Sequence, residues 1–270
     1  MHLVLLTSIL ALGAAHSSAP VTPVFSALRP APAWVEKGEK VTVTTEDKLE
    51  LAGTFWAPKS KQEAPGALLI HGAGGKRADL QDMADRLCKA GFAVLAIDLR
   101  GHGESVTADC DWTKLEPAAQ QELWTFATRD VKAGTKFLEG RKEVHGASIV
   151  LVGHREGCAL VARHAAKDEN VRGIALLDPP TGESGASQLD KDLAELGGLP
   201  TYISVPEERK DLAQRLAEDG QRANGGLDFI RVSVFGGGSN DLLQDAREAA
   251  EACKWLKERG FPNKARAPSR

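Results

Sequence analysis

The segment GHREG at residues 153–157 has the pattern of a turn that displays one side chain, and the residue at its centre is an arginine. An apolar run, residues 148–152, precedes the segment, and an alanine-rich amphipathic stretch follows it. This order predicts a strand, a sharp turn and a helix, because a glycine at each end lets the backbone turn tightly. A hydroxyl or thiol at the centre could attack a carbonyl carbon. Arg155 cannot, because its guanidinium stays protonated at any ordinary pH.

Two more motifs directly follow predicted strands. His71 and Gly72 end the run ALLIHG, and DLRGHGES occupies residues 98–105. With the GxxxG segment, these motifs resemble the serine aminopeptidase and dienelactone-hydrolase branch of the α/β-hydrolase superfamily. The resemblance implies an α/β-hydrolase fold, a mostly parallel central sheet of about eight strands with helices on both faces and no large cap domain. It also implies that the HG motif supplies an oxyanion-hole amide and that GxxxG is the nucleophile elbow.

The departures from the family pattern fall at the catalytic positions. The family's triad follows the chain order nucleophile, acid, histidine, and no histidine follows residue 164. Arg155 takes the nucleophile position, Arg209 aligns with the acid, and Ser239 takes the histidine position, with Asn240 as the alternative. The predicted triad is therefore degenerate, with no catalytic residue.

Other carboxylates lie near the predicted acid position. Glu208 is an uncertain substitute for the acid, and Asp178, at the end of a predicted strand, is an alternative acid. Neither has a histidine to orient, because the family's general base is missing.

Arg155 has two interpretations. In one, it fills a degenerate site and pairs with Asp178, Glu156 or Glu207, because a cation at a helix N-terminus needs a neighbouring carboxylate. In the other, it points a forked cation into a site formed by His71, Gly72, Ala73, Arg155 and Glu156, with backbone amides from Ala73 and Glu156. A site of the second kind suits a small carboxylate or a phosphate. The sequence leaves both open, and a protein partner remains an alternative to a small molecule.

An active acyl (ester or peptide) hydrolase with an unconventional nucleophile is the alternative function. Cys158 and Ser105 are the residues near the elbow that could serve. Cys158 lies almost one helical turn past the centre, so we expect its sulfur to face the interior. Ser105 lies outside any elbow geometry, and we expect His71 and His102 to be structural parts of their loops.

Strands alternating with helices predict the parallel sheet. We expect the opening strands, residues 40–58, to form a hairpin. A small lid would come from residues 99–116 and 179–198, which we expect to be the most mobile parts because they are rich in glycine, proline and polar groups. The predicted strands are 66–72, 92–98, 148–152, 171–178, 199–205 and 229–235, and the predicted helices are 78–90, closed by Gly91, 117–140, 206–219 and 241–259.

Composition limits the remaining possibilities. A net charge of −3 and 5% aromatic residues give no support to nucleic-acid binding. Residues 1–19 have the pattern of a signal peptide, which predicts a periplasmic or secreted protein with no membrane span in the mature chain; a cytoplasmic protein is the alternative. We expect a Pro/Ala-rich linker at 20–38, an α/β-hydrolase-like domain at 39–262 and a disordered tail at 263–270.

The four cysteines, Cys88, Cys110, Cys158 and Cys253, allow two disulfides with three pairings in an exported protein. Cys88 and Cys253 lie late in two helices that we expect to be side by side. They form a bridge there or are two small buried apolar side chains. The spacing of the cysteines is not a metal signature, and we expect no metal and no cofactor.

Overall fold

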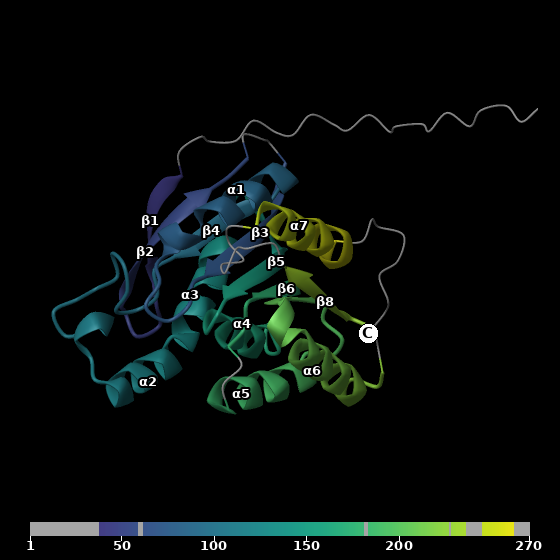
Figure 1. Ribbon diagram of the computed structural model, residues 1–270. Helices are drawn as coiled ribbons and strands as arrows, with labels where there is room; N and C mark the ends of the chain where they lie inside the picture. The colour runs from purple at the N-terminus through teal and green to yellow at the C-terminus, as the bar shows by residue number, and fades with distance from the viewer. Residues whose placement is uncertain (1–37, 59–61, 181–182, 227, 236–244, 262–270) are drawn as a thin grey trace, which may run out of the picture. The chain divides into compact units, whose positions relative to one another are not determined.

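The computed structural model describes residues 38–58, 62–180, 183–226, 228–235 and 245–261, and these residues carry one eight-stranded sheet (Figure 1). β1 is antiparallel to β2 and β2 is antiparallel to β4, whereas the other neighbouring pairs are parallel. The predicted hairpin and the mostly parallel sheet are confirmed. The strand order is β1 (Glu39–Thr44), β2 (Glu50–Trp56), β4 (Ala93–Ile97), β3 (Ala64–Ile70), β5 (Val144–His154), β6 (Val171–Leu177), β7 (Thr201–Pro206) and β8 (Ile230–Phe235).

Helices cover both faces of the sheet (Figure 1). One face carries α1 and α7, which pack against each other, and the other carries α3, α4, α5 and α6. The helices are α1 (Gln81–Ala90), α2 (Pro117–Phe126), α3 (Thr128–Glu139), α4 (Gly157–Ala165), α5 (Glu183–Ala194), α6 (Lys210–Ala223) and α7 (Ala246–Gly260), with single 3-10 turns at Arg77–Leu80, Trp112–Lys114 and Glu207–Arg209.

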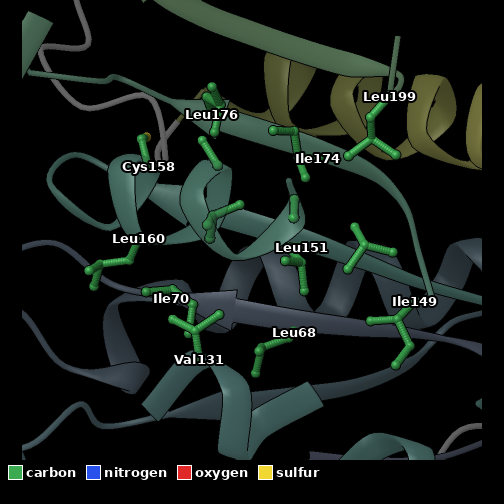
Figure 2. Packing of buried hydrophobic residues seen from close by; sticks show 14 of the residues in the cluster. Leu68, Ile70, Val131, Ile149, Leu151, Cys158, Leu160, Ile174, Leu176 and Leu199 are labelled. Atoms are coloured by element: carbon green, nitrogen blue, oxygen red, sulfur yellow. The ribbon is translucent and has the colours of Figure 1, made fainter. Parts of the chain in front are cut away.

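Strands β3 and β4 carry only apolar residues because they are buried on both faces. Successive side chains of a strand point to opposite faces, so Leu68 and Ile70 of β3 join the cluster under α3 and α4 (Figure 2). Ala67 and Leu69 join the cluster under α1 and α7. All four side chains are fully buried. This two-sided burial is why the sequence shows continuous apolar runs rather than alternation.

The predicted helix at residues 117–140 is wrong in one respect, because it is two helices separated at Ala127. Helix α3 buries a face that includes Val131 and Leu138, whereas α2 buries no residue. Packing against the sheet therefore sets the direction of α3 but not that of α2, so the two helices are separate. Ala127 is a good helix former, so the sequence holds no glycine or proline to indicate the break.

The predicted lid segment at residues 179–198 contains a helix, α5, rather than an irregular loop. Leu189 and Leu193 are buried, and α5 packs against α4 and α6. Leu196, just beyond the helix, is also buried. The three leucines have helical spacing, and their burial explains why a helix forms where glycine, proline and polar residues predicted a loop.

The last two predicted helices are present with shifted ends. The first begins with the 3-10 turn and continues through α6 to Ala223. The second, α7, begins at Ala246, after Asp245, whose side chain accepts hydrogen bonds from the amides of Arg247 and Glu248. An aspartate in this position satisfies amides that the first helical turn leaves unpaired.

The four cysteines are free thiols. Cys88 of α1 and Cys253 of α7 are both buried in the cluster shared by those helices, which lie side by side as predicted. Cys253 Sγ lies 3.5 Å from Met83 Sδ. This packing favours the interpretation of two buried apolar side chains.

Several predictions fall outside the described residues. These are the signal peptide, nearly all of the linker, the C-terminal tail and the histidine position at Ser239 or Asn240. Within the described ranges, the longest helices are too short or too polar to cross a bilayer.

Candidate functional site

The chain turns sharply between β5 and α4, and Arg155 is at the apex. Its φ angle is 49°, in the left-handed region that side chains other than glycine rarely adopt. A Cβ atom at Gly157 would lie 2.6 Å from the carbonyl oxygen of His71, and one at Gly153 would lie 2.8 Å from the amide nitrogen of Cys158. Both glycines are therefore required by space. The backbone has the form of a nucleophile elbow although the side chain cannot be a nucleophile.

The Arg155 side chain is 51% exposed and lies near one buried carboxylate. Its Nε atom is 3.6 Å from Oδ2 of Asp178, which is too long for a hydrogen bond. Asp178 directly follows β6, also has a positive φ of 56°, and donates its amide to the carbonyl of Ser204 at 2.8 Å. The structure therefore places the alternative acid beside the nucleophile position.

Arg209 contacts the same carboxylate from the other side. Its guanidinium is paired directly with Asp178 Oδ1 and donates a hydrogen bond to the carbonyl of Pro179 at 2.9 Å. Burial, together with the positive charge of Arg155, lowers the pKa of Arg209. Arg155 and Arg209, which the sequence predicts at the nucleophile and acid positions, thus share one aspartate.

The two glutamates before Arg209 do not join this cluster. Glu207 and Glu208 are both exposed, and Glu207 lies 3.7 Å from Lys210 Nζ. Neither is placed to act as a triad acid or as the partner of Arg155.

The loop that carries the HG motif lies against the elbow. A Cβ atom at Gly72 would be 2.9 Å from the Arg155 Cβ, which explains the glycine. The amide of Ala73 donates a hydrogen bond to Glu156 Oε2 at 3.0 Å. Sequence reasoning assigned a role to the backbone amide of Glu156 and missed the role of its carboxylate. The signal available was an acidic residue immediately after the elbow centre.

His71 uses both ring nitrogens within its loop. Nε2 accepts a hydrogen bond from the amide of Leu99 at 3.0 Å, so the ring proton is on Nδ1, which lies 2.7 Å from the carbonyl oxygen of Gly72. Burial lowers the pKa of His71 to about 4. His71 is therefore neutral near pH 7 and joins the HG loop to the end of β4.

His102 repeats the arrangement one loop away. Its Nε2 accepts from the amide of Gly74 at 3.1 Å, and its Nδ1 lies 2.8 Å from the carbonyl oxygen of Arg100. Burial also lowers the pKa of His102. Both imidazoles therefore have the bonding of structural elements, with no ring nitrogen left for a nucleophile.

Arg100 fastens the DLRGHGES loop to α3. Its backbone amide donates to Asp130 Oδ2 at 2.9 Å, and its Nε donates to Asp130 Oδ1 at 2.9 Å. A third contact joins the guanidinium to Asp47 of the hairpin turn at 3.0 Å. Arg100 and Asp130 are buried. This buried network holds the loop beneath the HG motif.

Cys158 faces the interior. It is fully buried, and its Sγ lies 3.2 Å from the carbonyl oxygen of Gly153 and 3.5 Å from that of Leu177. Figure 2 shows it among the apolar side chains of the core. Burial raises the pKa of this thiol well above its ordinary value, which disfavours the reactive thiolate.

The Ser105 hydroxyl also has a structural role. Its Oγ donates to the carbonyl of Asp98 at 2.7 Å and accepts from the amide of Ala52 at 2.9 Å. The residue is buried. Its hydroxyl therefore joins the turn after β4 to β2.

A contact between a hydroxyl and an imidazole lies away from the elbow. Thr135 Oγ1 of α3 lies 3.1 Å from His164 Nε2, in the last turn of α4. The same Nε2 is 3.1 Å from Asp168 Oδ2. A relay needs the hydroxyl and the acid on opposite ring nitrogens, so this group cannot activate the threonine. It lines a cavity of about 450 Å³ at that end of α4.

The comparison with known families covers this whole arrangement. Residues 64–214, which include the HG loop, the elbow and Arg209, match the family described as serine aminopeptidase, S33. The chain belongs to this family. Its membership agrees with the HG, DLRGHGES and GxxxG motifs.

Individual relatives of this S33 family member are distant. The uncharacterized protein Rv2307c of Mycobacterium tuberculosis is 28% identical over 229 residues, which is 84% of this chain and 68% of the relative. An uncharacterized 31.7 kDa protein of Escherichia coli is 32% identical over 133 residues, 48% of this chain and 43% of that protein.

Solved structures share the fold with this S33 family member. The Pyrococcus furiosus esterase Pf2001 has a TM-score of 0.61 at 18% identity, covering 82% of this chain and 92% of the esterase. A cold-adapted esterase from an Arctic intertidal metagenomic library has a TM-score of 0.58 at 19% identity, with 84% and 99% covered. At these identities the likeness concerns architecture alone.

Proposed function

We propose that this S33 family member lacks serine-hydrolase catalysis and binds a small carboxylate or phosphate anion through Arg155. The observation that carries the proposal is the half-exposed Arg155 side chain at the apex of the elbow. Its fork of N–H donors matches the geometry of a carboxylate or phosphate. The elbow would then present a binding group where relatives of this fold present a nucleophile.

The local charges support an anion site over an internal plug. Asp178 is paired directly with Arg209, while its distance to Arg155 Nε is 3.6 Å. Asp178 is therefore held more closely by Arg209 than by Arg155, and the Glu156 carboxylate is bound to the Ala73 amide. The contact of Arg155 with Asp178 is longer than a hydrogen bond, so Arg155 gives up no hydrogen bond to this carboxylate when it turns to an external anion.

Three features argue against hydrolysis. Arg155 has no lone pair available for attack, and both substitute nucleophiles, Cys158 and Ser105, are buried with their side chains bonded inside the fold. No histidine follows residue 164 in the sequence. A general base within reach of a nucleophile is the minimum that acyl transfer by this fold requires.

Binding of acetate and of inorganic phosphate, measured by calorimetry, tests the anion site. We expect Arg155→Ala to weaken binding by about tenfold or more, as the loss of a charge-assisted forked contact implies. Arg231→Ala is a matched control, because Arg231 is 52% exposed and lies 3.9 Å from Glu251. Equal binding by wild type and Arg155→Ala, or no binding by wild type, would contradict the proposal.

Turnover of nitrophenyl acetate and labelling by a fluorophosphonate or by iodoacetamide test the absence of catalysis. We expect no turnover above the buffer rate, no labelling by the fluorophosphonate, and iodoacetamide labelling of the folded protein at half-buried Cys110 alone. Iodoacetamide should react with Cys158 only after unfolding, because the thiol is fully buried. Labelling and turnover that both disappear in Cys158→Ala or in Ser105→Ala would establish the alternative, an acyl hydrolase with an unconventional nucleophile.

A further inference from the structure

The carboxylate of Glu156 accepts the hydrogen bond of the backbone amide of Ala73, which faces the elbow. Ala73 N donates to Glu156 Oε2 at 3.0 Å. The same oxygen would lie 2.9 Å from a Cβ atom at Gly72, so the carboxylate runs close along the HG loop. An amide N–H has one proton to donate. While this bond is made, an external oxygen cannot use the Ala73 amide.

From this contact we infer that Glu156 determines which anions the site accepts. A ligand on Arg155 can take the Ala73 amide only by displacing a carboxylate that is already charged and covalently held nearby. It also meets the negative charge of Glu156, one residue along the chain from Arg155. Like charges this close repel. The repulsion is larger for a dianion than for a monoanion.

The ligand class follows from these two effects. A singly charged carboxylate can bind Arg155 without the amide, whereas a phosphate dianion is disfavoured twice, through the blocked donor and through the added charge. Glu156 therefore makes the site selective for carboxylates over phosphate dianions. This selectivity rests on the anion-binding function proposed above, but the Glu156–Ala73 bond does not.

Hydrogen exchange at the Ala73 amide, followed by NMR, tests the bond without any ligand. Ala73 is half-buried, so its amide should exchange readily once the bond is lost. We expect Glu156→Ala to raise the exchange rate at least tenfold, and Glu156→Gln, which keeps an acceptor oxygen, to preserve protection. Glu207→Ala removes an exposed glutamate outside the cluster and should leave the rate unchanged. An unchanged rate in Glu156→Ala would overturn the inference.

Calorimetry with acetate and with phosphate at pH 8 tests the selectivity. We expect wild type to prefer acetate, and Glu156→Gln to increase the affinity for phosphate relative to acetate at least fivefold. In Glu156→Ala, acetate should also shift the Ala73 amide resonance. The same affinity ratio in all three proteins would overturn the inference. Faster exchange at Ala73 with no binding of either anion by any variant would instead uphold the bond and reject the anion-binding function.

Discussion

Protonation of His71 in the unfolded chain should lower the free energy of unfolding as the pH falls below about 6.5. Burial lowers its pKa in the folded protein from 6.5 to about 4. The unfolded chain therefore binds the proton more tightly. The contribution of neutral His71 to stability is complete above pH 6.5 and is lost as the pH falls toward 4. At about 1.4 kcal/mol for each pKa unit, the full loss is about 3 kcal/mol.

The measurement is urea unfolding at closely spaced pH values. About 2 kcal/mol of the loss falls between pH 6.5 and pH 5, where ordinary carboxylates titrate little. His102 shifts in the same direction and adds to the slope. We expect His71→Gln to reduce the pH dependence in this window by about 2 kcal/mol, whatever its stability at pH 7. His145→Gln, at an exposed position on β5, is the control.

The imidazole resonances provide a direct check. His71 should remain neutral down to about pH 4 in the folded protein. Titration of His71 near pH 6.5, or a His71→Gln variant with the wild-type slope, would refute the reasoning. The consequence reaches the site, because protonated His71 can no longer accept the Leu99 amide that joins the HG loop to β4.

Two other predictions concern stability, both measured by urea unfolding at pH 7. Gly157→Ala should destabilise by about 2 kcal/mol or more, because its Cβ would overlap backbone oxygens at 2.6 and 2.8 Å, whereas Gly140→Ala, with no atom nearer than 3.6 Å, should be close to neutral. Asp130→Ala should cost about 3 kcal/mol, because it leaves buried Arg100 without its main partner; a loss below about 1 kcal/mol would contradict a structural role for this pair.

The fold could be predicted from the sequence because its signals are local. Runs such as residues 67–70 and 93–97 are apolar at every position, which indicates strands buried on both faces. The elbow was equally visible, because Gly153 and Gly157 stand where no Cβ fits. Where a local signal was ambiguous, as at Ala127, tertiary packing decided the outcome.

Much of the candidate site could not be predicted, because it depends on contacts between distant residues. The sequence offered Asp178, Glu156 and Glu207 as partners of Arg155. Only the folding of β6 beside β5 brings Asp178 to the elbow. The bond between Ala73 and Glu156 joins residues 83 positions apart and has no motif. Such contacts follow from the three-dimensional path of the chain, which spacing along a sequence does not specify.

The left-handed backbone conformation at residue 155 does not depend on which side chain residue 155 carries. A conformation of this kind costs on the order of 1 to 3 kcal/mol for a residue other than glycine, and the crowding at the two neighbouring glycines holds it in place. None of those constraints involves the side chain at the apex. The same turn can therefore present a reactive hydroxyl or a permanent positive charge. A substitution at this one position changes the chemistry of the site while the path of the backbone stays the same.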